Sequence, residues 1–443
     1  MDKLPTKKLP VEIWDRSLRF NELKDTLRLR QVNKHFYELA TKICFEKIDL
    51  GYKESLTPAQ ALRVLVVGSE IVLKNNDISR SVLYFTVHVP TYTQPFNNVI
   101  SAGLGAMTRL LELDISLPSN QKNMPTDILG NAMLPFLHKF VYSGSLVEGA
   151  ISFIIRHADT LRELDFFGDN DPRSSFSSID GPVFAKLQSV AVPSQVFYVL
   201  IRCGMPALTK FVLLDTPKKL QPNDTLNVVQ ALSSHYNVGD NLEELQVQGK
   251  GYAEWLFNPI SRWFPNIKEL ALVSEQIVPS HVEYLSEVLD MTQVVHNCAQ
   301  MVRLTSLDWQ FGGNYVGTDD WERGWESLLQ LIKTSPTLTY ITLPESGTWK
   351  RLGTDVLWMP AHYDPQQPTR FGYDWLIDYI KAGKYNQLDS FLALVDRELC
   401  SNLKSSEEQS FEEDIRFVRG FKATLSEKDV VQLCTLAWRL YLL

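Results

Sequence analysis

The sequence has few cysteines, and those that it has are scattered. The five are Cys44, Cys203, Cys298, Cys400 and Cys434, and no two of them form a Cys-x-x-Cys pair. An odd, dispersed set argues against a disulfide framework and is typical of reduced thiols inside the cell. We therefore predict a protein of the cytoplasm, the nucleus or both.

Long apolar runs are missing as well. No stretch approaches the roughly 18 apolar residues that a membrane-spanning helix needs. The first residues, Met1-Asp2-Lys3-Leu4, lack the apolar core of a signal peptide. These absences predict a soluble intracellular protein that has no membrane partner.

The sequence contains none of the common catalytic motifs: no Gly-x-x-x-x-Gly-Lys-Ser/Thr, no His-Glu-x-x-His and no Gly-x-Ser-x-Gly. Gly103-Leu104-Gly105 is followed by Thr108 where a dinucleotide fingerprint needs a third glycine. Asp169-Asn170-Asp171 begins like a calcium loop, but Ser174 and Asp180 occupy the positions of its glycine and glutamate. We therefore predict no catalytic, cofactor-binding or metal-binding residues, and a protein that is not an enzyme.

Positive charge is scarce in most of the chain, whose formal net charge is -8. Residues 1–48 hold 11 Lys or Arg against 7 Asp or Glu, whereas the remainder holds 33 against 45. An acidic body repels phosphate backbones, because like charges face each other across any contact. Nucleic acid is therefore excluded as a partner.

The features that are present begin with a helical pattern in residues 9–48. Pro10 suits the first position of a helix, and Leu9, Ile13 and Leu18 recur near one helical face. A second apolar set from Leu23 to Ile43 also follows helical steps. Some forty residues are close to the lower limit for an independent core. We expect these helices to bury their apolar faces against the rest of the chain or a partner.

The order of residues in this segment resembles the F-box family. The motif residues are Leu9, Pro10, Glu12, Leu27, Leu29, Val32, Asn33, Lys34 and Phe36. The resemblance implies that the helices pack on a Skp adaptor subunit and so tether the chain to the cullin/RING core of a ubiquitin ligase. The residues that it places on the Skp side are Leu9, Pro10, Ile13, Leu18, Leu27, Val32 and Phe36.

The body contains a repeated apolar frame, in which large residues occupy the first, fourth and sixth positions. It recurs at Val82-Phe85-Val87, Leu110-Leu113-Ile115, Leu137-Phe140-Tyr142, Leu161-Leu164-Phe166, Leu187-Val190-Val192, Leu208-Phe211-Leu213, Leu242-Leu245-Val247, Ile267-Leu270-Leu272, Leu304-Leu307-Trp309 and Leu338-Ile341-Leu343. Successive frames begin 21 to 37 residues apart. A sustained period of this length is typical of a repeat protein.

Helical patterns separate the frames, so each unit reads as a strand followed by a helix. The expected helices are 148–157, 196–202, 225–235, 281–298 and 325–333. This predicts an α/β repeat fold, an irregular leucine-rich-repeat-like solenoid in which stacked neighbours share one core. A doubly wound sheet or an eight-stranded barrel has a similar period and is the alternative. No Asn or Cys stands eight residues after the first frame residue, as leucine-rich repeats usually have, which predicts irregular loops.

If each frame is a strand, its third and fifth positions face away from the helices onto an exposed concave sheet. The acidic residues at these positions are Glu112, Asp114, Glu163, Asp165, Glu244, Glu269 and Asp308. Two positions are basic, Lys139 and Lys210. This surface is either a recruitment surface that prefers a basic protein partner or the solvated face of an acidic protein.

The sequence therefore divides into three predicted regions: 1–50, an F-box-like helical module; 51–346, the solenoid; and 347–443, an aromatic and proline-rich loop followed by a helical cap. The function that the F-box resemblance implies is a substrate-recognition adaptor of a Skp–cullin–F-box ubiquitin ligase, with a protein substrate recruited on the repeat domain. One alternative is a repeat scaffold whose first helices only cap the solenoid, and a less favoured one is an α/β enzyme.

Overall fold

The computed structural model describes the following residues: 18–19, 23–50, 60, 63, 66–68, 70, 74–88, 94–117, 128–129, 132–144, 148–168, 183–214, 222–234, 238–249, 256–274, 291–311, 330–343, 347–352 and 357–360. The chain forms two compact units. Unit 1 comprises Met1–Ile267 and Ser274–Gln276, and unit 2 comprises Lys268–Val273 and Ile277–Leu443.

Unit 1 is built on strands that lie side by side in the order of the chain. They are β1 (Lys47–Leu50), β2 (Tyr84–His88), β3 (Glu112–Ser116), β4 (Lys139–Ser143), β5 (Glu163–Phe167), β6 (Ser189–Val192), β7 (Lys210–Leu214) and β8 (Glu244–Gly249). Every neighbouring pair from β1 to β8 is parallel. The order never reverses, as it would in a doubly wound sheet, so the α/β repeat interpretation is confirmed.

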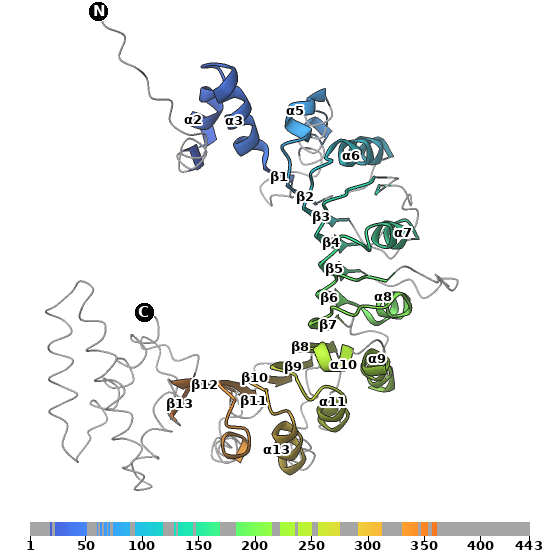
Figure 1. The fold of residues 1–443 in the computed structure, drawn as a ribbon, viewed down its shortest axis with the longest axis vertical. Coiled ribbons are helices and arrows are strands. Elements are labelled where there is room, and N and C mark those ends of the chain that lie inside the picture. The colour runs from blue at the N-terminus through green and yellow to red at the C-terminus, as the bar shows by residue number, and fades with distance from the viewer. Residues whose placement is uncertain are drawn as a thin grey trace, which may run out of the picture. The chain divides into compact units, whose positions relative to one another are not determined.

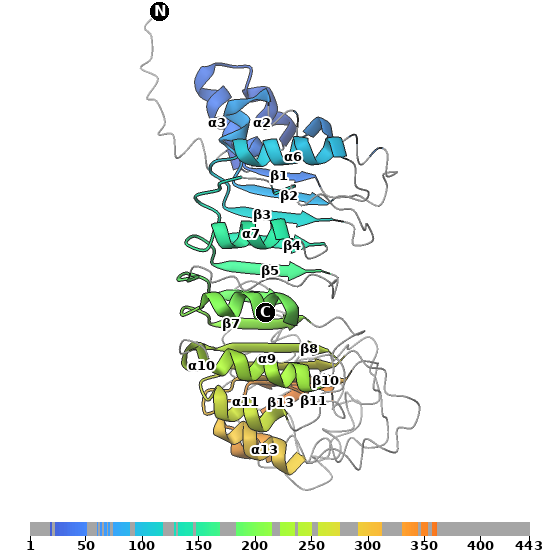
Figure 2. The ribbon, with the colours of Figure 1, turned by 90° about the vertical axis from the view of Figure 1, so that its right-hand side faces the viewer.

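Helices follow most strands and lie along one side of the sheet (Figures 1 and 2). In unit 1 they are α5 (Asn76–Ser79), α6 (Gln94–Ala106), α7 (Glu148–Arg156), α8 (Ser194–Leu200), the short 3-10 helix η1 (Ile201–Cys203), α9 (Pro222–Ser234), α10 (Val238–Asn241) and α11 (Phe257–Trp263). Two further helices, α2 (Leu23–Leu29) and α3 (Lys34–Phe45), precede β1. The predicted helices at 148–157, 196–202 and 225–235 correspond to α7, α8 and α9. The opposite side of β1–β8, which we call the sheet face, carries no helix of the described residues (Figure 1).

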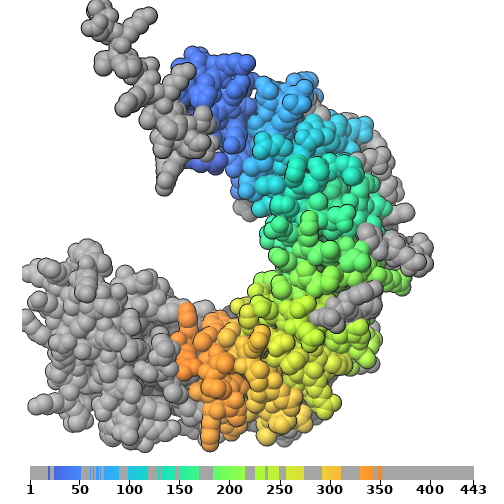
Figure 3. Space-filling view, viewed as in Figure 1, coloured from blue at the N-terminus to red at the C-terminus, as the bar shows by residue number. Residues whose placement is uncertain are grey.

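The repeated frames form the core. All ten coincide with strands, and each of their thirty apolar side chains is at most 3% exposed. Aromatic residues fill the space between strand and helix. The Phe140 ring lies 4.9 Å from the Phe153 ring of α7, and the Tyr142 ring lies 4.9 Å from that of Phe166 on the next strand. Each repeat is therefore packed both on its own helix and on its neighbour, as the continuous packing of unit 1 in Figure 3 illustrates.

A recurring hydrogen-bond pattern sets the register of the repeats. At the start of each strand, two successive backbone N–H groups donate to one carbonyl of the preceding repeat. In β3 to β4, for example, His138 N and Lys139 N lie 2.8 and 3.1 Å from Leu111 O. The accepting carbonyls from β1 onward in unit 1 belong to Glu46, Leu83, Leu111, His138, Arg162, Gln188 and Thr209. Because this contact does not involve the connecting segments, repeats of unequal length still start in line.

Unit 2 continues the same repeat and then changes direction. Its elements are β9 (Glu269–Ser274), α13 (Met291–Gln300), β10 (Ser306–Phe311), β11 (Tyr340–Leu343), β12 (Gly347–Leu352) and β13 (Leu357–Pro360). β10 and β11 are parallel, whereas β12 and β13 are antiparallel to their neighbours. The predicted aromatic loop at 347 therefore begins with two strands instead. The prolines and tryptophans of this segment predicted a loop, but residues 347–352 pair with β11, from Tyr340 opposite Lys350 to Leu343 opposite Gly347.

The first strand was not predicted either. β1 lies inside residues 1–50, which were assigned wholly to the helical module, and it directly follows α3. Phe45, Ile48 and Leu50 match the repeated frame, so the signal was present, but the helical pattern that ends at Phe45 concealed it. The predicted helical cap lies outside the described residues. The positions eight residues after the first frame residue were predicted to lie in irregular loops. The described residues include one of them, Gln195, and it lies in α8.

Candidate functional site

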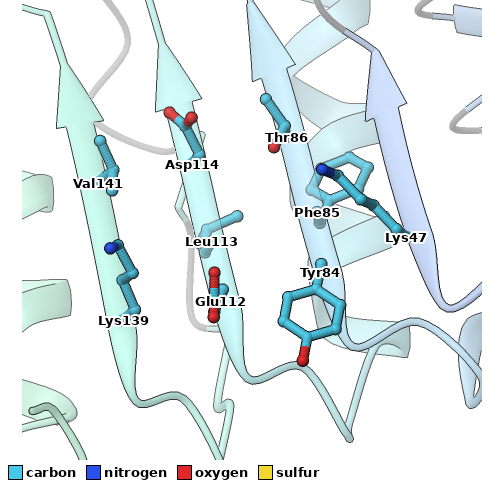
Figure 4. Close-up of a pocket in the computed structure, with 9 residues that line it drawn as sticks. All are labelled: Lys47, Tyr84, Phe85, Thr86, Glu112, Leu113, Asp114, Lys139 and Val141. Carbon is cyan, nitrogen blue, oxygen red and sulfur yellow. The ribbon is translucent and has the colours of Figure 1, made fainter. Parts of the chain in front are cut away.

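The in-register stacking aligns the third position of each repeat into one row across the sheet face. We call this the lysine–glutamate row: Lys47, Tyr84, Glu112, Lys139, Glu163, Ser189, Lys210 and Glu244. Neighbours within a row are about 4.8 Å apart, the usual strand spacing, so their side chains are in reach of one another. Figure 4 shows Tyr84, Glu112 and Lys139 at the same level on β2, β3 and β4.

Acidic and basic side chains pair within this row. Lys139 Nζ lies 2.7 Å from Glu163 Oε2, and Lys210 Nζ lies 2.6 Å from Glu244 Oε2. The hydrogen bond to Glu163 is the main reason that the pKa of Lys139 is raised above its usual value. Exposed pairs of this kind contribute at most about 1 kcal/mol to stability, so their main effect here is to neutralise charge.

The fifth positions form a second row with a different balance. We call it the aspartate row: Asp49, Thr86, Asp114, Val141, Asp165, Ala191, Val212 and Gln246. It contains no lysine or arginine, and its carboxylates stand on alternate strands. The negative potential of the sheet face therefore comes chiefly from this row.

Two of these carboxylates have distinct surroundings. Partial burial raises the pKa of the Asp165 carboxyl above its usual value, and the Lys139 ammonium opposes that shift. Asp114 Oδ2 lies 3.8 Å from Nε2 of His88, two residues beyond Thr86 on β2. A ligand that brings positive charge to this row would compensate the desolvation of Asp165.

A hollow of about 400 Å³ lies on the sheet face between β1 and β4 (Figure 4). Its lining combines both charge signs with an aromatic ring and aliphatic groups: Lys47, Tyr84, Phe85, Thr86, Glu112, Leu113, Asp114, Lys139 and Val141. Phe167, at the end of β5, does not line the hollow, but it is a 45% exposed aromatic side chain on the next strand after β4. This composition suits an elongated ligand that carries positive charge and apolar groups.

The structure brings together most of the residues predicted for the concave surface. Glu112, Asp114, Glu163, Asp165 and Glu244 lie on the sheet face of unit 1. Glu269 lies on β9 and Asp308 on β10, both in unit 2. Sequence reasoning missed Lys47, because β1 was missed. It also missed that Lys139 and Lys210 pair with neighbouring glutamates, since those partners are 24 and 34 residues away in the chain.

The residues of the F-box-like motif lie in and before a helical hairpin. Leu27 in α2 is 37% exposed, and Val32 in the turn after α2 is 60% exposed. Leu18, which precedes α2, is only 2% exposed. Phe36 is half-buried in the first turn of α3. Leu9, Pro10 and Ile13 lie outside the described residues.

Local interactions hold the hairpin in shape. Asn33 caps α3, because its Oδ1 accepts a hydrogen bond from the Phe36 N–H at 3.0 Å. The Arg30 guanidinium lies over the rings of Tyr37 and Phe45, at 4.9 and 5.1 Å from their centroids. These cation–π contacts tie the turn between α2 and α3 to both ends of α3.

Comparison with known protein families and with curated protein sequences found no match. Within the described ranges, no three His, Cys, Asp or Glu side chains are grouped so as to hold a metal ion. The helices described here include none with the length and apolar character needed to cross a membrane.

Proposed function

We propose that this protein is a non-catalytic substrate-recognition adaptor of a Skp–cullin–F-box ubiquitin ligase. The α2–α3 hairpin would dock on the Skp adaptor, and the sheet face would hold a protein substrate. Such an adaptor accelerates ubiquitin transfer by proximity, because a held substrate has a high effective concentration near the ligase.

The exposure of Val32 carries this proposal. The frame residues of the repeats are at most 3% exposed, whereas two residues of the F-box-like motif, Val32 and Leu27, are 60% and 37% exposed. Apolar side chains gathered on a short helical hairpin suit a groove on a partner. If the hairpin served only to cover the first repeat, Val32 would be expected to lie within the chain.

A repeat scaffold without a ligase role is the second candidate, and one observation favours it. α3 leads through Glu46 directly into β1, and its Leu39 and Ala40 are buried. The same helix packs against α5. The hairpin is thus continuous with the repeats, as a solenoid cap would be.

Co-purification with a Skp adaptor from a related source tests the proposal. The full chain should be captured stoichiometrically, and the Leu9→Ala/Pro10→Ala variant should lose capture. A Val32→Glu variant should weaken capture by more than about tenfold, because it would bury an unpaired charge at the interface. Val302→Glu is the matched control, since Val302 is 67% exposed and lies in unit 2.

Two outcomes would contradict the adaptor role. One is a folded full-length chain that captures no Skp adaptor, which would favour the scaffold. The other is equal capture by the Val32→Glu and Val302→Glu variants, which would remove the hairpin from the interface. Circular dichroism melts of all variants establish that they are folded.

A further inference from the structure

The sheet face of β1–β5 restricts the kind of protein segment that could bind there. Its lysine–glutamate row is internally balanced, because Lys139 is held by Glu163 at 2.7 Å. The adjoining aspartate row has carboxylates on β1, β3 and β5 and contains no lysine or arginine. The imidazole nearest to it is that of His88, whose Nε2 lies 3.8 Å from Asp114 Oδ2. A ligand with positive charge therefore gains most from the aspartate row, while the neighbouring row offers it little net attraction.

The spacing of the carboxylates is set by the sheet. Asp114 and Asp165 are separated by one intervening strand, so they stand about 9.6 Å apart along the row. Asp49 continues the same interval on the other side of Asp114. A ligand that crosses the strands must present its basic groups at this repeat distance on one of its faces.

One backbone conformation meets that requirement well. A polyproline II helix has three residues per turn and rises about 3.1 Å per residue, so every third side chain lies on one face about 9.3 Å apart. In a β-strand, side chains on one face recur at about 6.6 or 13 Å. In an α-helix the nearest match, seven residues, is about 10.5 Å and drifts out of step over two intervals.

The apolar groups of the site fit the same ligand. Polyproline II segments dock on aromatic side chains. Tyr84 lines the hollow, and the exposed Phe167 lies two residues beyond Asp165 on the same strand. The two rings flank the aspartate row, where they can contact the residues between the basic ones.

We propose that the sheet face of β1–β5 binds an extended, polyproline-II-like protein segment that carries Lys or Arg at every third residue. The basic side chains reach Asp114 and Asp165, and Asp49 extends the row. This inference rests on the part of the proposed function that makes the sheet face a recruiting surface. It does not depend on the Skp adaptor.

Fluorescence anisotropy with the full chain and a labelled peptide of three Arg-Pro-Pro repeats tests the inference. A peptide of the same composition with its arginines in one block is the comparison. The repeat peptide should bind several-fold more tightly than the block peptide. Asp114→Asn and Asp165→Asn should each weaken its binding by about three- to tenfold.

Two further variants sharpen the test. Asp240→Asn removes an exposed carboxylate of α10, away from the sheet face, and should leave binding unchanged. Lys139→Met removes the base beside Glu163 and should tighten binding, because it adds net negative charge to the site. A purely structural role of these residues would not produce changes of opposite sign.

Equal binding of the two peptides would overturn the inference, since it would indicate only a general attraction to an acidic protein. The same conclusion follows if Asp114→Asn and Asp165→Asn behave like Asp240→Asn. Skp capture, measured on the same preparation, separates this result from the proposed function. If the chain captures Skp but binds both peptides equally, the proposed adaptor role stands and the proposed polyproline-II-like ligand is refuted.

Discussion

Substitution of Gly168 by alanine should destabilise unit 1 by disrupting the contact between β4 and β5. An added Cβ at Gly168 would fall on the carbonyl oxygen of Gly144 and 2.8 Å from Cε1 of Phe166. Both neighbours are fixed, since Phe166 is fully buried and Gly144 N donates to Phe167 O at 2.9 Å. The backbones must therefore separate at the ends of these strands.

The expected cost combines two effects. Overpacking of this kind costs about 1–3 kcal/mol, and loss of the Gly144 hydrogen bond costs about 1 kcal/mol. The free energy of unfolding should thus fall by about 2–4 kcal/mol. With a urea dependence of about 3 kcal/mol per molar, the midpoint should fall by about 1 M.

Urea unfolding followed by circular dichroism provides the measurement, and Gly105→Ala provides the control. Gly105 lies in α6 with no atom within 4 Å of an added Cβ, so alanine there should stabilise by about 0.5–1 kcal/mol. An unchanged midpoint for Gly168→Ala, or a larger loss for Gly105→Ala, would refute the packing argument. Because Asp165 lies on β5, Gly168→Ala should also weaken peptide binding.

Two further predictions concern buried titratable groups. His157 Nδ1 donates to Phe153 O at 2.8 Å and its Nε2 accepts from Leu134 N–H at 3.0 Å, and burial lowers its pKa, so it stays neutral. The stabilisation by His157 is complete above the unfolded pKa of about 6.5 and decreases as pH falls through the lower folded value. Between pH 7 and 5, the free energy of unfolding, measured with urea, should therefore decrease less in His157→Gln than in the unsubstituted chain. Equal decreases would contradict this. Cys298 is 0% exposed, and this burial raises the pKa of its thiol to about 12. Iodoacetamide at pH 8 should therefore label Cys298 only after unfolding, whereas the half-buried Cys44 should react sooner; peptide mapping would detect the opposite order.

The repeat architecture could be predicted because its signal is local. The alternation of buried and exposed positions within Leu110-Leu113-Ile115 is enough to specify a strand. The same reasoning failed where two signals overlapped. Phe45 both ends the apolar pattern of α3 and begins the frame of β1, so the helical interpretation concealed the strand.

The amino-acid sequence by itself determined which side chains face the core and which face outward, because that choice depends on a period of two residues within each strand. Only the tertiary structure decided which outward residues are neighbours. Glu163 meets Lys139, and Asp165 falls in line with Asp114, because paired N–H groups at each strand start hold successive repeats in register. Because the connecting segments differ in length, the spacing of residues along the chain does not show which outward residues align. The alignment is produced by hydrogen bonds between residues that are far apart in the sequence.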